Sequence, residues 1–87
     1  MEENRDMINI RFFAMLRERL GIDTLDYEYT DEKTVADIKH KLVARGEPWT
    51  LLAEQDVLIA LNQALTSGSA VVNDGDEIAF FPPVTGG

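Results

Sequence analysis

The chain has 87 residues, 45% of them hydrophobic and 28% charged, a composition typical of one small folded domain. Sixteen acidic and eight basic residues give a net charge of −8, which disfavours binding to the phosphate backbone of nucleic acids. The absence of cysteine excludes disulfides and thiolate chemistry, a single histidine excludes multi-histidine metal sites, and no apolar run reaches the ~20 residues of a membrane span.

These exclusions indicate which cellular compartment and which binding partners to expect. The polar, acidic N-terminus lacks the positive charge and the apolar core of a signal peptide. We therefore expect a cytoplasmic protein that holds no metal ion and binds neither membranes nor nucleic acid. The acidity favours a protein partner with a basic surface, although it would also keep a small protein soluble without any partner.

The first elements are an extension and a strand. Residues 1–6 are polar and charged, and we expect them to form a flexible extension. From Met7 onward apolar and polar residues alternate, which predicts a strand with one face in the core. The core-facing residues of this strand are Ile8, Ile10 and Phe12. The same alternation places Phe13 on the opposite face of the sheet, with Arg11.

Two helices and a second strand follow. Good helix formers at positions 14–20 predict a short helix, and alternation over positions 25–29 predicts a strand. The main helix begins after Thr34, which forms a capping-box pattern with Asp37. The apolar stripe of this helix is Val35, Ile38 and Leu42. The stripe predicts that one side of the helix packs on the sheet.

The second half of the chain contains two more predicted strands. The nearly continuous apolar run Val57–Leu61 favours a central strand. It is followed by an Asn-Gln turn and an exposed corner that carries Leu65, and then by a short edge piece at positions 71–72. The acidic turn at positions 73–76 leads into the last strand, Ile78–Phe81.

The aromatic residues that end the first and last strands suggest a binding surface. Alternation places Ile78 and Phe80 in the core, so Phe81 faces the other side of the sheet, as Phe13 does. Leu65 is expected near that face. Large aromatic side chains in an exposed cluster usually mark an interface. The alternative is that a bulge near either strand end turns one of them inward.

The end of the chain predicts an extended tail. Pro82 and Pro83 lack the N–H group that a sheet ladder needs, so they end the last strand. The remaining residues finish on Gly86 and Gly87, which bring no side chain near the terminal carboxylate. Such a carboxylate suits activation by adenylation in an enzyme's site. The alternative for this tail is simple fraying.

Other polar residues have structural explanations. His40 lies opposite the apolar stripe of its helix, which indicates a surface residue and not a catalytic one. The carboxylates of Asp74, Asp76 and Glu77 lack the ligand spacing of a calcium loop and are explained by turn formation.

Three stretches together resemble a known family. They are Phe12-Phe13-Ala14 with Arg17-Glu18, then Ala60-Leu61-Asn62-Gln63, and finally Asp74-Gly75-Asp76-Glu77 with Ala79-Phe80-Phe81-Pro82-Pro83-Val84-Thr85-Gly86-Gly87. From about Met7 onward the chain resembles the small subunit of molybdopterin synthase, a sulfur carrier with a ubiquitin-like β-grasp fold. The element order agrees with such an α+β fold, with a mixed sheet of four to five strands and one main helix packed on one face. The resemblance implies a β-grasp domain at 7–81, between the extension at 1–6 and a diglycine tail at 82–87.

The resemblance implies a mechanism. A ubiquitin-activating-like enzyme would use ATP to adenylate the Gly87 carboxylate, and sulfur would then be added to form a thiocarboxylate. The tail would enter the large synthase subunit and donate sulfur to cyclic pyranopterin monophosphate. The two kinds of subunit would form a two-plus-two heterotetramer. This chain would be its non-catalytic sulfur donor, with no permanently bound cofactor and with the active site on the large subunit.

The resemblance also implies the site residues. The reacting residue would be Gly87. The partner-binding residues would be the rest of the tail, two phenylalanines, an arginine and a leucine: Pro82, Pro83, Val84, Thr85, Gly86, Phe13, Phe81, Arg17 and Leu65. Three rivals remain: a ubiquitin-like modifier conjugated to lysines, a sulfur carrier for another pathway such as thiamin or tungsten-cofactor synthesis, and an interaction domain with an inert tail.

Overall fold

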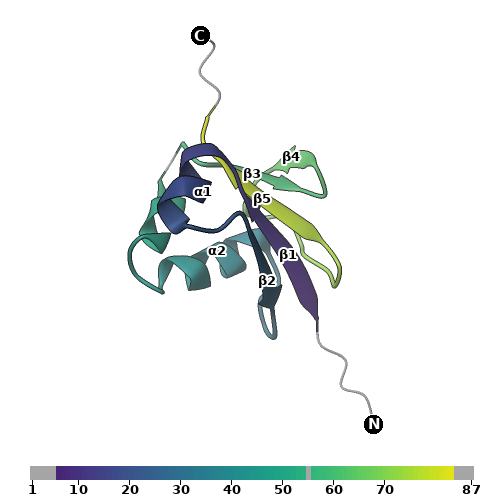
Figure 1. Cartoon of the computed structure of the whole chain (residues 1–87). Helices are drawn as coiled ribbons and strands as arrows, with labels where there is room; N and C mark the ends of the chain where they lie inside the picture. Colours follow the sequence, from purple (N-terminus) through teal and green to yellow (C-terminus); the bar gives the residue numbers. More distant parts are fainter. Residues whose placement is uncertain (1–5, 55, 84–87) are drawn as a thin grey trace.

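One mixed sheet of five strands organises the molecule, and its strand order is β2-β1-β5-β3-β4 (Figure 1). The computed structural model describes residues 6–54 and 56–83. The elements are β1 (Met7–Phe12), α1 (Ala14–Leu20), β2 (Thr24–Glu28), α2 (Val35–Val43), the 3₁₀ helix η1 (Trp49–Ala53), β3 (Leu58–Leu61), β4 (Ala64–Thr66) and β5 (Glu77–Phe81). The expected α+β β-grasp fold is confirmed. The boundaries proposed for the extension and the tail stay predictions, since 1–5 and 84–87 lie outside the described residues.

β5 is the middle strand of the sheet, and the run Val57–Leu61, predicted as a central strand, forms β3, which has β5 on one side and β4 on the other. β5 pairs in parallel with β1 and antiparallel with β3, so β3 stands one place further from the middle. The apolar run reflects burial, because Ile59 and Ala60 are both buried in β3.

β4 was not predicted, and it replaces the edge piece expected at positions 71–72. Asn62 and Gln63 have φ angles of 53° and 70°, and this two-residue left-handed turn returns the chain antiparallel to β3. Val71 makes only an isolated bridge with Thr34, and the neighbouring Val72 is buried in the core. Val72 therefore belongs to the core, whereas Val71 is 62% exposed, and neither residue extends the sheet as a strand.

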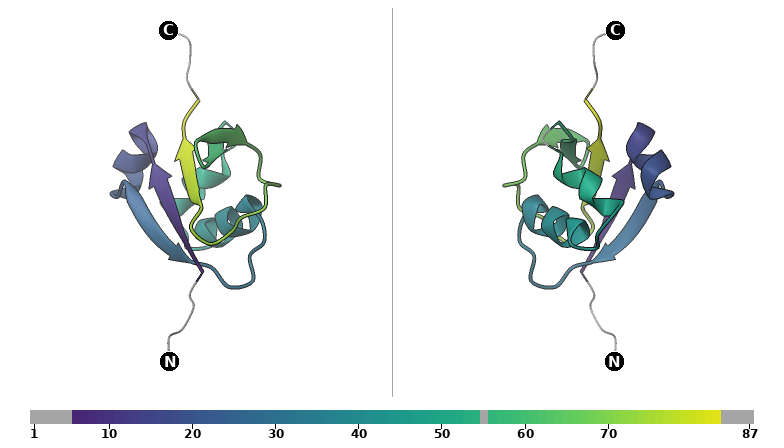
Figure 2. Two further views of the ribbon diagram at one scale, coloured as in Figure 1. Left: turned by 90° about the vertical axis from the view of Figure 1, so that its right-hand side faces the viewer. Right: turned by 90° about the vertical axis from the view of Figure 1, so that its left-hand side faces the viewer.

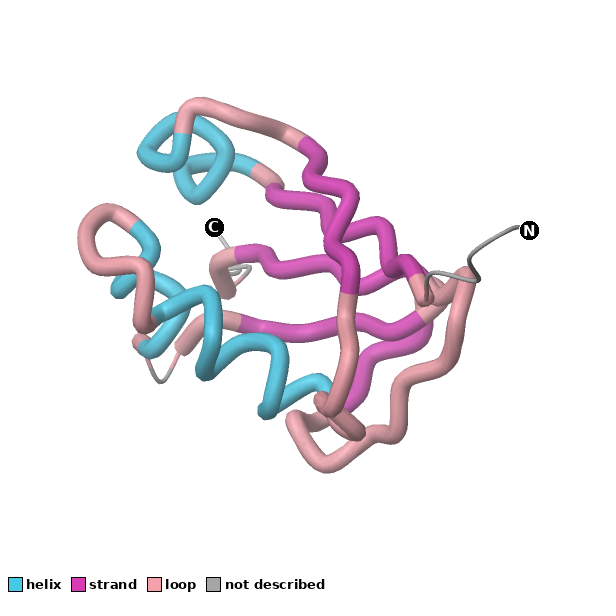
Figure 3. Tube along the Cα trace, turned by 90° about the horizontal axis from the view of Figure 1, so that it is seen from below, coloured by secondary structure: helices cyan, strands magenta, loops and turns pink. Residues whose placement is uncertain are grey.

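Helix α2 packs across one face of the sheet (Figures 2 and 3). Its capping box is formed: the Thr34 hydroxyl accepts from the Asp37 N–H at 3.3 Å, and the Asp37 carboxylate accepts from the Thr34 N–H at 3.1 Å. The predicted stripe is fully buried, as Val35, Ile38 and Leu42 each have 0% exposure. None of the described helices is long and apolar enough to cross a membrane.

The core joins the sheet to its helices through aromatic contacts. Phe12 of β1 and Phe80 of β5 stack with ring centroids 6.0 Å apart. Trp49 of η1 meets Phe12 edge-on at 5.8 Å, and Leu52 of η1 is fully buried. These contacts fix the β1 and β5 ends at which the chain turns away from the sheet.

Candidate functional site

The candidate site begins where β1 and β5 end together. Phe12 is the register partner of Phe80, and both side chains are buried in the core. The next residue of each strand turns to the other face: Phe13 is 41% exposed and Phe81 is half-buried. A hydrogen bond from the Phe13 N–H to the Phe80 carbonyl, at 3.2 Å, ties the two strand ends. The prediction that these two phenylalanines lie outside the core is confirmed.

An apolar depression of about 510 Å³ lies at these strand ends, and we call it the strand-end groove. Its lining is almost entirely carbon. The residues that line it are Phe13, Ala14, Gln63, Ala79, Phe81, Pro82 and Pro83. The groove thus lies against the point at which the chain leaves the sheet, so a protein bound there would also meet Pro82 and Pro83.

Unusual backbone conformations shape two sides of the groove. Ala14 has a φ angle of 55°, a left-handed conformation that costs energy for any residue with a Cβ atom. This residue turns the chain from β1 directly into α1. On the other side, Asn62 fastens its turn to the start of β5: its N–H donates to the Glu77 carbonyl at 2.7 Å, and its side-chain oxygen accepts from the Glu77 N–H at 2.9 Å.

Leu65 and Arg17 lie outside the groove lining. Leu65 is 70% exposed and pairs with Ala60, which in turn pairs with Ala79 of the groove. Residues paired in this way share one face, so Leu65 lies on the same open face of the sheet, two strands away. Arg17 is exposed on α1 and lines a separate polar depression with Asp23.

The remaining predicted site residues divide between the described and undescribed parts of the chain. Pro82 and Pro83 follow β5 and line the groove. Val84, Thr85, Gly86 and Gly87 lie outside the described residues. Their proposed roles in partner binding and in sulfur transfer therefore stay predictions.

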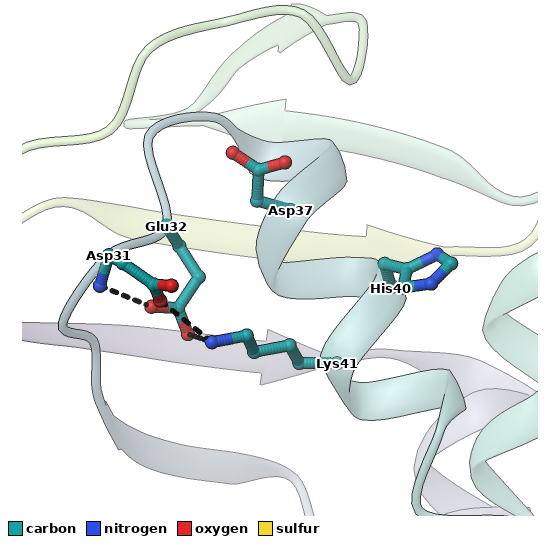
Figure 4. A pocket seen from close by; sticks show the side chains of 5 residues that line it. All are labelled: Asp31, Glu32, Asp37, His40 and Lys41. Atoms are coloured by element: carbon teal, nitrogen blue, oxygen red, sulfur yellow. Dashed lines mark hydrogen bonds and ion pairs between the residues drawn. The ribbon is translucent and has the colours of Figure 1, made fainter.

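Another polar depression lies beside α2 and is lined by Asp31, Glu32, Asp37, His40 and Lys41 (Figure 4). Its most buried member is Glu32, at 6% exposure. The Glu32 carboxylate accepts hydrogen bonds from the Tyr27 hydroxyl at 2.5 Å and from the N–H groups of Thr30 and Asp31 at 2.9 and 3.1 Å. Lys41 binds the Asp31 carboxylate at 2.8 Å.

The titration behaviour of this cluster follows from these bonds. Burial acts to raise the pKa of Glu32, but the hydrogen bonds from Tyr27 and Thr30 outweigh it and lower that pKa. Burial, reinforced by the hydrogen bond to Glu32, raises the pKa of Tyr27. The hydrogen bond to Lys41 lowers the pKa of Asp31. These contacts hold the loop that carries Asp31 and Glu32 against Lys41 of α2. His40 lies beside the cluster and is exposed, as its position on the helix predicted.

Metal binding has no support in the described part of the chain. Residues 6–54 and 56–83 contain no grouping of three or more His, Asp or Glu side chains that could hold a metal ion. The Asp74 carboxylate instead accepts a hydrogen bond from the N–H group of Met7, at the start of β1. The Asp76 carboxylate accepts one from the N–H group of Asn73, within the turn. Turn formation thus explains these carboxylates.

Three groove residues were not among the predicted site residues: Ala14, Gln63 and Ala79. Ala79 could have been found, since it lies two residues before Phe81 and so shares its face. Gln63 was recognised only as part of a turn. The placement of Gln63 against Ala79 depends on the pairing of β3 with β5, which the local sequence does not reveal.

Comparison with known sequences gives consistent relatives. Residues 10–87 match the ThiS family. The chain is 44% identical over 82 residues to the molybdopterin synthase sulfur carrier subunit of Haemophilus influenzae, and 43% identical to that of Escherichia coli, covering 93% of this chain and all of each relative. It is also 33% identical to the small archaeal modifier protein 3 of Haloferax volcanii, covering 92% of this chain and 98% of the relative.

Two solved structures illustrate the likeness in three dimensions. A Haloferax volcanii protein known from its solution structure superposes with a TM-score of 0.79 at 29% identity, covering 100% of this chain and 92% of the other. The complex of subunits 1 and 2 of the molybdopterin-converting factor of Helicobacter pylori contains a chain with a TM-score of 0.65 at 26% identity, covering 93% of this chain and 99% of that one.

Proposed function

Because the chain belongs to the ThiS family, and matches molybdopterin synthase sulfur carrier subunits over almost its whole length, we propose that it is such a sulfur carrier in molybdenum-cofactor biosynthesis. One observation carries the proposal furthest: the relatives at 43–44% identity are matched over their entire length. The strand-end groove supports it, because this apolar surface includes Pro82 and Pro83, the first residues of the tail that would carry the sulfur.

The proposed chemistry takes place at the Gly87 carboxylate. A carboxylate oxygen attacks the α-phosphorus of ATP in an activating enzyme, pyrophosphate leaves, and an acyl-adenylate forms. Hydrosulfide then attacks the carbonyl carbon and displaces AMP, and loss of the remaining proton from sulfur leaves a thiocarboxylate. Gly86 and Gly87 suit this step, because neither brings a side chain into the approach to the carbonyl.

The proposed partner for sulfur donation is the large subunit of molybdopterin synthase. The strand-end groove, with Phe13 and Phe81, would receive an apolar surface of that subunit, while the tail from Pro82 to Gly87 would reach a bound pterin precursor, cyclic pyranopterin monophosphate. Leu65 and Arg17 would lie at the margins of this contact. The Helicobacter pylori complex of two subunits supports an assembly of this kind. A two-plus-two stoichiometry belongs to the same proposal.

A second candidate function is protein modification. The relative from Haloferax volcanii is a small archaeal modifier protein and is matched over 98% of its length. In that case the activated Gly87 would be joined to lysine amines of other proteins. The same activation step serves both functions, so they differ only in the acceptor.

Intact-mass measurement tests the proposal. The purified chain is incubated with ATP, its activating enzyme and a sulfur donor, and we expect a mass gain equal to the replacement of one oxygen by sulfur. Addition of the large subunit and the pterin precursor should then reverse that gain and yield a dithiolene product. An unchanged mass after activation would refute the carrier role, and lysine adducts in cell extract without any thiocarboxylate would favour the modifier.

A further inference from the structure

Arg11 of β1 lies on the open face of the sheet next to the strand-end groove. It is the register partner of Ala79, which lines the groove, and Ala79 pairs in turn with Ala60 of β3. Its side chain is 51% exposed. Arg11 therefore places a cation at the border of an apolar surface in a chain whose net charge is −8.

Two contacts hold the Arg11 side chain in place. The guanidinium Nη1 lies 3.3 Å from Oε2 of Glu77, the first residue of β5. The guanidinium carbon lies 5.7 Å from the centroid of the Phe13 ring, within the range of a cation–π contact. Glu77, Arg11 and Phe13 thus form a chain of contacts that runs along the open face to the groove.

The contact with Arg11 can restrict the motion of the Phe13 ring before a partner binds. The Phe13 backbone is fixed, because its N–H donates to the Phe80 carbonyl at 3.2 Å and its carbonyl accepts from the Leu16 N–H at 3.1 Å. Phe13 as a whole, however, is 41% exposed. An exposed ring that must be ordered on binding costs conformational entropy, and a neighbour that orders it beforehand reduces this cost.

We propose that Arg11 is a positioning residue of the docking surface, which holds the Phe13 ring in the orientation that the partner binds. The proposal rests on the proposed function, in which the strand-end groove receives the large subunit. Arg11 acts through the ring and not by a contact of its own with the partner. Glu77 supports it by fixing the guanidinium.

A double-mutant cycle on binding to the large subunit tests this role. Arg11→Ala is measured in the native chain and in a Phe13→Leu chain, which keeps an apolar side chain but lacks the ring. A cation–π contact at an exposed position corresponds to a change of about two- to five-fold in Kd. We expect Arg11→Ala to weaken binding by that factor in the native chain and to have no effect in the Phe13→Leu chain. Arg11→Lys should retain part of the native affinity.

Controls separate this proposal from the function on which it rests. Arg19→Ala removes the same charge from α1, at a residue that does not line the groove, and should leave Kd unchanged. If Arg11→Ala weakens binding equally in both backgrounds, Arg11 contacts the partner directly and the positioning role is wrong. An unchanged Kd in the native chain would also overturn it. If instead Phe81→Glu binds the large subunit as well as the native chain does, the docking surface itself has been misplaced.

Discussion

Phe80 and Phe81 are neighbours in β5, and their side chains lie on opposite faces of the sheet. Phe80 has 0% exposure and stacks on Phe12 in the core, whereas Phe81 lines the strand-end groove. The two residues have the same side chain, but one is part of the hydrophobic core and the other is part of the groove surface. Replacing each in turn therefore separates stability from partner binding.

Phe81→Glu should weaken association with the large subunit by at least about 2 kcal/mol, since a charge would replace an apolar contact in the groove. The loss of folding stability should be smaller, because Phe81 is only half-buried. Titration calorimetry and thermal unfolding measure the two effects. Phe80→Ala is the matched variant and should destabilise the fold by about 3–5 kcal/mol. A collapse of the melting temperature in Phe81→Glu would show that Phe81 belongs to the core.

Deletion of Gly87 should abolish sulfur transfer and leave the fold intact. In the proposed chemistry, the deletion would move the reacting carboxylate by one residue, away from the position that an activating enzyme would reach. The buried hydrophobic residues of the described chain all fall between Ile8 and Phe80, so the melting temperature should not change. Intact-mass measurement after activation and a thermal scan check the two parts. Sulfur transfer by the shortened chain would contradict the proposed chemistry.

Glu32→Ala should destabilise the fold by about 1–3 kcal/mol, because the Tyr27 hydroxyl and the N–H groups of Thr30 and Asp31 would lose their acceptor. Urea unfolding of the variant and the native chain at pH 7 measures this difference. The exposed Glu47→Gln serves as a control for the loss of one negative charge.

The contribution of Glu32 should depend on pH. Its pKa is lowered in the folded protein, so the stability that it provides is fully present above its ordinary pKa and is lost as the pH falls through the folded value. The advantage of the native chain over Glu32→Gln should therefore shrink as the pH falls from about 5 to below the ordinary pKa of a glutamate. Urea unfolding across this range measures it, and a constant difference would contradict the expectation.

Ala14→Gly should stabilise the fold by about 0.5–1 kcal/mol, because the φ angle of 55° at Ala14 strains a residue with a Cβ atom. The matched control is Ala36→Gly in α2, where regular helical geometry favours alanine and the change should cost about 1 kcal/mol. Urea unfolding compares the three proteins. A loss of stability in both variants would show that position 14 carries no strain.

The faces of residues could be predicted from the sequence, but the order of the strands could not. Strict alternation placed Phe12 and Phe80 in the core and their neighbours outside it, since the pleat persists to the last residue of each strand. The parallel pairing of β1 with β5 joins residues such as Phe12 and Phe80 that are far apart in the chain, and local patterns carry no signal for it. For that reason β5 was not recognised as central.

Some residues of the strand-end groove could be predicted from local sequence patterns, whereas others depend on contacts between distant parts of the chain. Phe13 and Phe81 were identified because each follows a clear strand pattern. Gln63 joins them only through the pairing of β3 with β5, and Ala14 only through a backbone conformation that alanine does not favour. β4 escaped prediction because three residues with an exposed Leu65 show too short an alternation to distinguish a strand from a loop.

The central place of β5 has a mechanical consequence for the segment that begins at Pro82. A strand at the edge of a sheet can be peeled away under tension one hydrogen bond after another. β5 is held by ladders to β1 and β3 on both sides, and both would have to yield before the strand moved. A pull on the end of the chain would therefore be borne by two ladders in the middle of the sheet, and not by a single ladder at its edge.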